Sequence, residues 1–172
     1  MSRQPRPTGL IGESRVFQDM LAAIGKIAGY DAPVLISGET GSGKELAARA
    51  IHYQGKRSDK PFIPVNCGAL PDHLIENELF GHCKGAYTDA RDNQTGLIAQ
   101  AEGGTLFLDE VDALSPKAQV SLLRFLEDGK YRPLGGNRLE FADVRILAAC
   151  NVDLQDLVNQ EHFRADLHYR LN

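Results

Sequence analysis

Apolar residues recur every three or four positions in two stretches of the chain, and this spacing predicts amphipathic helices. Ser14 precedes the first stretch as a helix N-cap, and Gly29 ends it. Pro116 stands at a favoured early position of the second, and Gly129 ends it. The apolar stripe of the first helix comprises Phe17, Met20, Leu21, Ile24, Ile27 and Ala28. That of the second comprises Val120, Leu123 and Leu126.

Short, continuous apolar runs predict buried strands at residues 34–36, 62–65, 105–108 and 145–149. A helical stretch follows the first run, to about Tyr53. Residues 131–133 and 138–141, separated by Gly135-Gly136-Asn137, are typical of a hairpin. Strands that alternate with helices predict an α/β fold with a parallel sheet covered on both faces. Ligands of such sheets gather beyond the carboxyl ends of the strands.

Polar residues follow the predicted strands at this edge. They are Lys44, Asn66, Asp109, Glu110 and Asn151. Because the carboxyl ends of parallel strands share one edge of the sheet, we expect these residues to form a single site.

The residues after the first strand match the phosphate-loop pattern G-x-x-x-x-G-K. They are Gly38, Glu39, Thr40, Gly41, Ser42, Gly43 and Lys44. Glycines let backbone N–H groups turn towards a phosphate, and the lysine reaches the outer phosphates. A glycine-rich turn with a surface lysine is the simpler alternative. Glu45 stands where most such loops place a Ser or Thr that holds Mg²⁺, which counts against small GTPases and most P-loop kinases.

Asp109 and Glu110 follow the third apolar run as adjacent carboxylates. Their side chains should point to opposite sides of the strand and take different roles. Asp109 suits Mg²⁺, and Glu110 suits a base that polarises an attacking water. A surface Asp-Glu pair is the alternative, and the phosphate loop counts against it. Asn66 ends a neighbouring strand, and spacing alone favours an Asx turn there.

The composition fits one globular domain, since 42% of the 172 residues are hydrophobic and 24% are charged. The net charge of −4 is a poor match to a phosphate backbone, so we expect DNA contact only through a domain outside this segment. Three cysteines without a CxxC spacing favour a reduced, cytoplasmic protein. No apolar run approaches the roughly 18 residues that span a bilayer, so no membrane association is expected. The basic residues 1–9 lack the apolar stretch of a signal peptide and are expected to be a tail or linker.

From residue 10 to residue 172 the chain resembles the central AAA+ domain of bacterial enhancer-binding proteins, the nitrogen-regulatory and phage-shock type activators of sigma-54 promoters. The matching strings are LIGES, GETGSGKELAARAIH, FIPVNCGALPDHLIENELFGHCKGAYTDA, AEGGTLFLDEVD, LLRFLEDGKYRPLGG and FRADLHYRLN. The resemblance implies a P-loop NTPase three-layer sandwich that binds ATP and Mg²⁺ and hydrolyses ATP. It also implies a homo-oligomeric ring, a hexamer in the full protein, that remodels the sigma-54 RNA polymerase holoenzyme. The family's helical lid, sensor II arginine and DNA-binding domain have no counterpart in residues 10–172, so we expect a large ATPase subdomain truncated before its lid.

The resemblance also implies roles for single residues. Leu10, Ile11 and Gly12 would line the adenine pocket, and residues 38–45 would be the Walker A loop, whose Glu45 the family shares. Asp109 and Glu110 would be Walker B, and Asn66 would be the partner of a glutamate switch. Asn151 would be sensor I, although Cys150 replaces a common Thr before it. Arg164 and Arg170 would be arginine fingers that reach the γ-phosphate of an adjacent subunit.

One matching segment departs from the family's GAFTGA loop, which carries movement to sigma-54. It comprises Gly85, Ala86, Tyr87, Thr88, Asp89 and Ala90. Tyr87 keeps an aromatic ring, but Asp89 adds a charge and a Cβ where glycine supplies unusual dihedrals. Two functions therefore stay open: a remodeller of the sigma-54 holoenzyme, and a nucleotide-responsive oligomerisation module that does not activate sigma-54. A small-molecule P-loop kinase is disfavoured, since no acceptor-binding element is recognisable.

Overall fold

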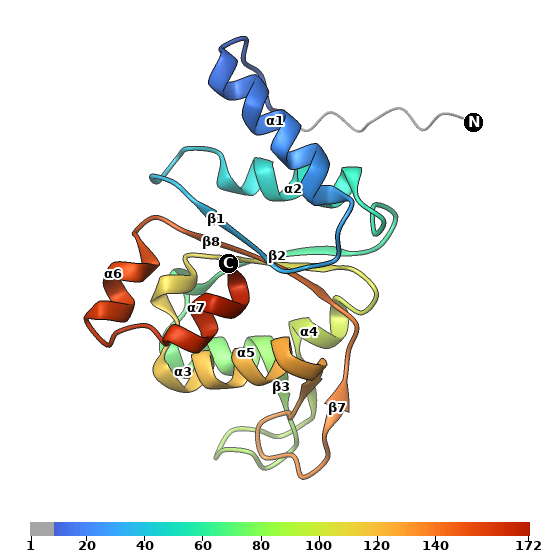
Figure 1. The fold of residues 1–172 in the computed structure, drawn as a ribbon. Helices are drawn as coiled ribbons and strands as arrows, with labels where there is room; N and C mark the ends of the chain where they lie inside the picture. The colour runs from blue at the N-terminus through green and yellow to red at the C-terminus, as the bar shows by residue number, and fades with distance from the viewer. Residues whose placement is uncertain (1–8) are drawn as a thin grey trace.

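The computed structural model describes residues 9–172, with the side chains of all but residues 72 and 73 (Figure 1). Its central sheet has four parallel strands in the order β1-β8-β5-β2. Their bounds are Val34–Ser37 for β1, Arg145–Cys150 for β8, Thr105–Asp109 for β5 and Phe62–Asn66 for β2. The four predicted strands and the α/β class are confirmed. Residues 1–8 lie outside the described part, so the expected tail remains a prediction.

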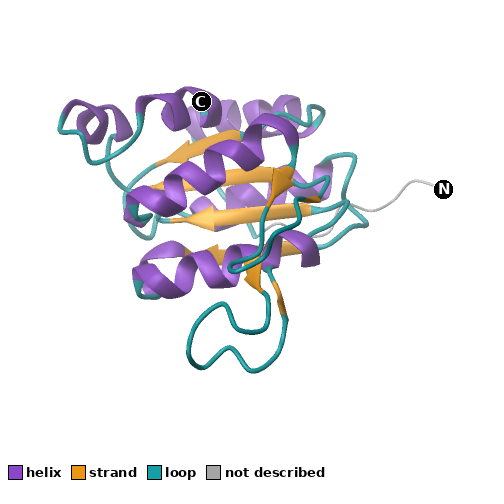
Figure 2. Ribbon diagram, turned by 90° about the horizontal axis from the view of Figure 1, so that it is seen from below, coloured by secondary structure: helices purple, strands orange, loops and turns teal. Residues whose placement is uncertain are grey.

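Helices cover both faces of the sheet, as Figures 1 and 2 show from two directions. On one face lie α1 (Arg15–Ala28) and α2 (Lys44–Gln54). The opposite face carries α3 (Asp72–Phe80), α4 (Leu97–Gln100), α5 (Pro116–Asp128), α6 (Leu154–Asn159) and α7 (Ala165–Leu171). The predicted three-layer sandwich is therefore confirmed.

Successive residues of the central strands alternate between two hydrophobic clusters. In β5, Leu106 and Leu108 pack with α3 and α5, while Phe107 packs with α1 and α2. In β8, Ala148 belongs to the first cluster and Leu147 to the second. Because side chains alternate along a strand, a continuous apolar run is what a strand covered on both faces requires.

The helix caps are as predicted. The Ser14 hydroxyl accepts a hydrogen bond from the N–H of Phe17, and Gly29 follows the last turn of α1. Ser115 caps α5, Pro116 is its first residue, and Gly129 ends it in the left-handed conformation that glycine tolerates best.

Three predicted burial patterns are wrong in part. The first strand, β1, is only half-buried because it is an edge strand of the described sheet, with a neighbour on one side. In α1, Met20 is 37% exposed although it lies on the predicted stripe. The fully buried face of α5 is different from the predicted one. It comprises Ala118, Gln119, Leu122 and Phe125, while Val120, Leu123 and Leu126 flank it half-buried.

Two short hairpins lie at the end of the molecule away from α1 (Figure 1). The predicted hairpin is confirmed as β6 (Lys130–Tyr131) and β7 (Glu140–Phe141), shorter than expected. The other, β3 (Gly81–His82) with β4 (Gln94–Thr95), carries the loop of residues 85–90 between its strands. A backbone bridge between His82 and Leu134 joins the two hairpins.

Two short 3₁₀ turns follow strands of the sheet: η1 (Cys67–Ala69) after β2 and η2 (Val111–Ala113) after β5. Cys67, Cys83 and Cys150 form no disulfide. In the part of the chain that the structure describes, every helix is too short or too polar to cross a membrane.

Candidate nucleotide site

The glycine-rich loop joins the carboxyl end of β1 to the amino end of α2. Its first residue is anchored to the sheet, since the N–H of Gly38 donates to the carbonyl of Cys150 at 3.2 Å. Gly41 and Gly43 have φ angles of +80° and +86°, in the left-handed region, and Gly43 is the N-cap of α2. A Cβ on Gly38 would lie 2.8 Å from the Ser42 hydroxyl. All three glycines are therefore required by the shape of the loop.

Lys44 folds back over this loop. Its Nζ donates to the carbonyl oxygens of Gly38 at 2.8 Å and Glu39 at 2.9 Å. The positive charge thus lies beside backbone N–H groups at the start of α2, where the helix dipole also favours an anion. Glu45 forms an exposed ion pair with Arg49 at 2.7 Å. Its carboxylate is engaged along the helix surface, so another residue must hold any metal ion.

The two acidic residues leave β5 by different routes. Asp109 is the last residue of the strand, in register with Asn66 of β2, and its Oδ1 accepts a hydrogen bond from the N–H of Glu110 at 3.0 Å. Glu110 lies outside the strand with φ of +53° and begins η2. The prediction that strand alternation separates the two side chains is therefore wrong. A left-handed turn, which is strained for a non-glycine residue, sets the position of Glu110 instead.

Asn66 and Glu110 both lie beside η1. The Asn66 Oδ1 accepts hydrogen bonds from the N–H groups of Gly68 at 2.8 Å and Ala69 at 2.9 Å. This is the Asx turn that spacing alone favours. The Glu110 carboxylate packs so closely on Gly68 that a Cβ there would overlap its Oε2. No hydrogen bond joins the two side chains among residues 9–172, so the glutamate switch remains a prediction.

The pKa of the Cys67 thiol is raised by its surroundings, which include three carboxylates. Burial, together with the smaller effect of the negative charges of Asp109, Asp112 and Glu110, raises the pKa of Cys67 to about 12. One oxygen of Asp112 is buried without a hydrogen-bond partner among the described residues. The surroundings of Cys67 at the carboxyl ends of β2 and β5 are therefore negatively charged.

Other expected site residues are only partly assembled around the loop. Asn151 Nδ2 donates to the Thr40 hydroxyl at 3.4 Å, which places the expected sensor beside the phosphate loop. Leu10 packs against the α1–α2 cluster, but Ile11 is 93% exposed. Gly12 approaches Phe17 so closely that a Cβ would lie 2.7 Å from its ring. The described residues thus leave Ile11 without an enclosing pocket.

The two expected fingers bond to groups of their own chain. The Arg164 guanidinium forms a two-point pair with Asp166, with Nε–Oδ1 at 3.0 Å and Nη2–Oδ2 at 2.7 Å. This pairing raises the pKa of Arg164. Arg170 Nη2 donates to the Leu126 carbonyl at 3.0 Å. Among the interactions of the described residues, neither arginine contacts Lys44, Asp109 or Glu110.

The loop of residues 85–90 closes on itself. The N–H of Gly85 donates to the carbonyl of Ala90 at 2.8 Å, and the Tyr87 ring meets His82 edge-on with centroids 5.1 Å apart. Gly85 has φ of +82°, whereas the only non-glycine residues with positive φ in the described range 9–172 are Glu110 and Glu161. In this conformation position 89 therefore needs no glycine dihedrals. The exposed charge of Asp89 is the remaining departure from the family loop.

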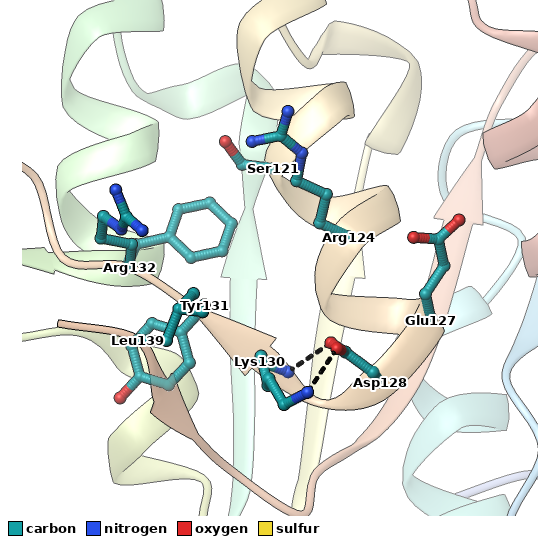
Figure 3. A pocket seen from close by; sticks show the side chains of 9 residues that line it. Ser121, Arg124, Glu127, Asp128, Lys130, Tyr131, Arg132 and Leu139 are labelled. Carbon is teal, nitrogen blue, oxygen red and sulfur yellow. Dashed lines mark hydrogen bonds and ion pairs between the residues drawn. The ribbon is translucent and has the colours of Figure 1, made fainter.

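A hollow of about 370 Å³ lies between α5 and β6 (Figure 3). The Arg124 and Arg132 side chains line it, and Lys130 there pairs with Asp128 at 2.9 Å. It contains none of the site residues predicted from the sequence.

Sequence reasoning missed two residues that the geometry brings forward. Gly68 leaves space for the Glu110 carboxylate, and no sequence pattern around Gly68 predicts that contact. Gln119 is buried in α5 and bonded to the segment before α7. A signal did exist for Gln119, since it lies between Ala118 and Leu122 as a polar residue on an apolar helix face.

Comparisons with known proteins agree with this geometry. The model of the family described as "Sigma-54 interaction domain" matches residues 10–172. The response regulator protein PilR of Pseudomonas aeruginosa is 51% identical over 168 residues, which are 98% of this chain and 38% of PilR. The DNA-binding transcriptional regulator NtrC of Rhizobium meliloti is 49% identical over 163 residues, 95% of this chain and 34% of NtrC.

Solved structures give the same result. The crystal structure of NtrX from Brucella abortus in complex with ATP matches with a TM-score of 0.88 at 34% identity, covering 95% of this chain and 35% of NtrX. The chain therefore spans little more than a third of the length of these proteins.

Proposed function

Because this chain belongs to the Sigma-54 interaction domain family and has its P-loop NTPase fold, we propose that it binds and hydrolyses ATP to remodel the sigma-54 RNA polymerase holoenzyme. The single observation that carries this proposal is the convergence of three elements at the carboxyl edge of one sheet. These are the glycine-rich loop with Lys44, the Asp109-Glu110 pair and Asn151.

Each of these residues has a role in the proposed reaction. The loop N–H groups and Lys44 hold the β- and γ-phosphates. Glu110 orients a water and accepts its proton as the oxygen attacks the γ-phosphorus, and the bond to the ADP oxygen breaks. Asn151, whose amide donates to the Thr40 hydroxyl in the phosphate loop, would contact the γ-phosphate.

The residues fit a magnesium ion that is shared with the phosphates. No three His, Cys, Asp or Glu side chains in the described range converge as a metal site of their own. Asp109 would therefore hold Mg²⁺, directly or through water, together with phosphate oxygens. When bound, the ion neutralises charge that develops on the transferred group.

In the proposed ring, each subunit receives its arginine fingers from a neighbouring copy. Arg164 and Arg170 bond to Asp166 and Leu126 of their own chain, and no hydrogen bond or ion pair among the described residues joins either of them to the phosphate loop. We therefore place them as fingers that act on the nucleotide of an adjacent copy, in a homo-oligomeric ring. DNA contact belongs to a different domain of the whole protein, since the net charge here is −4.

A pair of substitutions tests the nucleotide site. Lys44→Ala should abolish ATP binding, because it removes the positive charge that would contact the outer phosphates. Glu110→Gln should leave binding of a fluorescent ATP analogue intact and lower turnover by about 10²- to 10⁴-fold. Wild-type affinity in Lys44→Ala would refute the site, and a Glu110→Gln protein that hydrolyses normally would show that another residue positions the water.

Exposed Asp89 favours the second candidate, a nucleotide-responsive oligomerisation module that does not activate sigma-54. The test is capture of sigma-54 by the full-length protein in a transition-state-analogue complex. Since position 89 needs no glycine dihedrals here, Asp89→Asn and Asp89→Gly should strengthen capture to a similar extent if charge alone weakens it. Absence of capture in all three proteins, with ATP turnover intact, would support the module and refute the remodeller.

A further inference from the structure

Gln119 is a polar side chain buried inside the hydrophobic face of α5. It is 1% exposed, and its neighbours on that face, Ala118 and Leu122, are fully buried. A buried amide needs hydrogen-bond partners for all of its groups, or it destabilises the fold. The partners of Gln119 therefore show what the residue holds in place.

Those partners belong to two segments that are far apart in the sequence. Nε2 donates to the Leu114 carbonyl at 2.9 Å and to the His162 carbonyl at 3.2 Å. Oε1 accepts a hydrogen bond from the backbone N–H of Arg164 at 2.9 Å. Both amide protons and the carbonyl oxygen are thus engaged, which fixes the orientation of the side chain.

The first segment leads directly from Glu110, the proposed catalytic base. Glu110 is the N-cap of η2 and Leu114 is its C-cap, with the Leu114 N–H bonded to the Val111 carbonyl at 3.2 Å. Ser115 then caps α5, which carries Gln119. A change in the position of Glu110 or of η2 therefore reaches Gln119 through one short, ordered segment.

The second segment presents the proposed arginine finger. Arg164 is the N-cap of α7, but its side chain does not cap that helix. Upstream, Glu161 is held in the left-handed region with φ of +60°, and buried Phe163 anchors the turn. Gln119 bonds this turn on both sides of Phe163, so it determines where the Arg164 backbone lies relative to α5.

We propose that Gln119 is a positioning residue that couples the catalytic turn of one protomer to the arginine finger that the protomer offers to its neighbour. The inference rests on the proposed function, since it requires Arg164 to act in trans. Gln119 touches neither the phosphate loop nor, in its own chain, the acids of the site. Its replacement should therefore lower turnover in the neighbouring subunit and leave ATP affinity unchanged.

Mixed rings of the full-length protein separate these effects. One subunit type carries Arg164→Ala and retains a working site, while the other carries Glu110→Gln and retains a working finger. In mixtures, hydrolysis requires the finger of the second type to reach the site of the first. Gln119→Met, which keeps the side-chain volume and removes all three hydrogen bonds, is then added to one type at a time.

Gln119→Met in the finger-donating type should lower the ATPase of the mixture ten-fold or more, since a displacement of about 1 Å costs on the order of 100-fold. In the type that lacks the finger, it should change the rate less than two-fold. Gln54→Met, the same replacement at an exposed position that ends α2, is the matched control and should change neither mixture.

Three results would overturn the inference. Equal losses from both placements would show a general folding defect, and no loss from either would show that Gln119 does not position the finger. If the parent mixture without Gln119→Met hydrolyses no ATP although Arg164→Ala binds it, action in trans fails, and the inference fails with it. ATP affinity of the Gln119→Met protein, measured with a fluorescent analogue, should equal that of the parent.

Discussion

Gly43→Ala tests whether the backbone of the phosphate loop, rather than its side chains, forms the nucleotide site. Gly43 has φ of +86°, and an added Cβ would meet only the Leu46 Cδ1, at an ordinary contact distance of 3.9 Å. The substitution therefore introduces conformational strain without a clash. An L-residue in the left-handed region costs about 1–2 kcal/mol.

That cost divides between folding and binding. If the loop keeps its conformation, the free energy of unfolding falls by the full amount. If the loop relaxes instead, ATP must restore the strained conformation, and affinity falls by about 5- to 30-fold, the equivalent of the same energy. The sum of the two losses should be about 1–2 kcal/mol.

Urea unfolding with and without saturating ATP and Mg²⁺ measures this sum, in a Glu110→Gln background that prevents turnover. Gly25→Ala is the matched control, because Gly25 lies exposed inside α1 without a positive φ. That replacement should stabilise the protein by about 0.5–1 kcal/mol through helix propensity. A Gly43→Ala protein with unchanged stability and unchanged ATP affinity would refute the reasoning.

The same loop offers a contrasting case at Gly38. A Cβ there would lie 2.8 Å from the Ser42 hydroxyl and 3.7 Å from the Ser42 Cβ. The obstacle is thus a side-chain oxygen, so Ser42→Ala should restore much of the affinity that Gly38→Ala loses. No side-chain deletion should rescue Gly43→Ala, because the strain lies in its own backbone.

Three further predictions concern other groups. Asp166→Asn should release the Arg164 guanidinium and raise ATPase activity at limiting protein concentration. The increase should be at most about five-fold, because the ion pair is exposed. Activity that is unchanged or lower than that of an Asp156→Asn control would contradict this prediction. Burial, together with the hydrogen bond to Glu140, raises the pKa of Tyr131, so the folded state retains its proton more strongly and stability is lost as pH rises above about 10. Urea unfolding between pH 8 and about 11 should show a shallower fall for Tyr131→Phe, and parallel curves would exclude the effect. Cys67 and Cys150 are buried and have raised pKa values, whereas Cys83 is half-buried. At pH 8 a thiol reagent should therefore modify Cys83 first, and all three cysteines only after unfolding. Fast alkylation of Cys67 in the folded protein would contradict the packing.

The parts of the fold that depend on local chemistry were predictable from the sequence. The Ser14 hydroxyl caps the start of α1, and Gly129 adopts the left-handed conformation that ends α5. Neither property depends on distant segments. The four strands were recognisable because a sheet covered on both faces requires continuous apolar runs. The phosphate loop was recognisable because glycines are required where φ is positive.

The parts that depend on distant segments were not predictable in this way. The position of Glu110 follows from a left-handed turn after β5. It also depends on Gly68 in η1, the turn after β2, which leaves space for the Glu110 carboxylate. The buried face of α5 was shifted because Gln119, a polar residue, belongs to it. Its place on an apolar helix face was visible in the sequence, but that pattern cannot identify its partners, such as Arg164, which lie in a different element.

The self-bonded arginines have a thermodynamic consequence for assembly. In the proposed ring, Arg164 would leave its carboxylate partner Asp166 to reach a phosphate, so the guanidinium would exchange one anion for another. An exposed pair of this kind is weak in water, whereas a triphosphate carries more negative charge than a single carboxylate. The exchange is therefore favourable only when nucleotide and neighbour are both in place. By linkage, the factor by which assembly tightens ATP binding must equal the factor by which ATP tightens assembly. In the proposed ring, the same guanidinium would therefore couple nucleotide state to oligomeric state, and ATP should promote assembly.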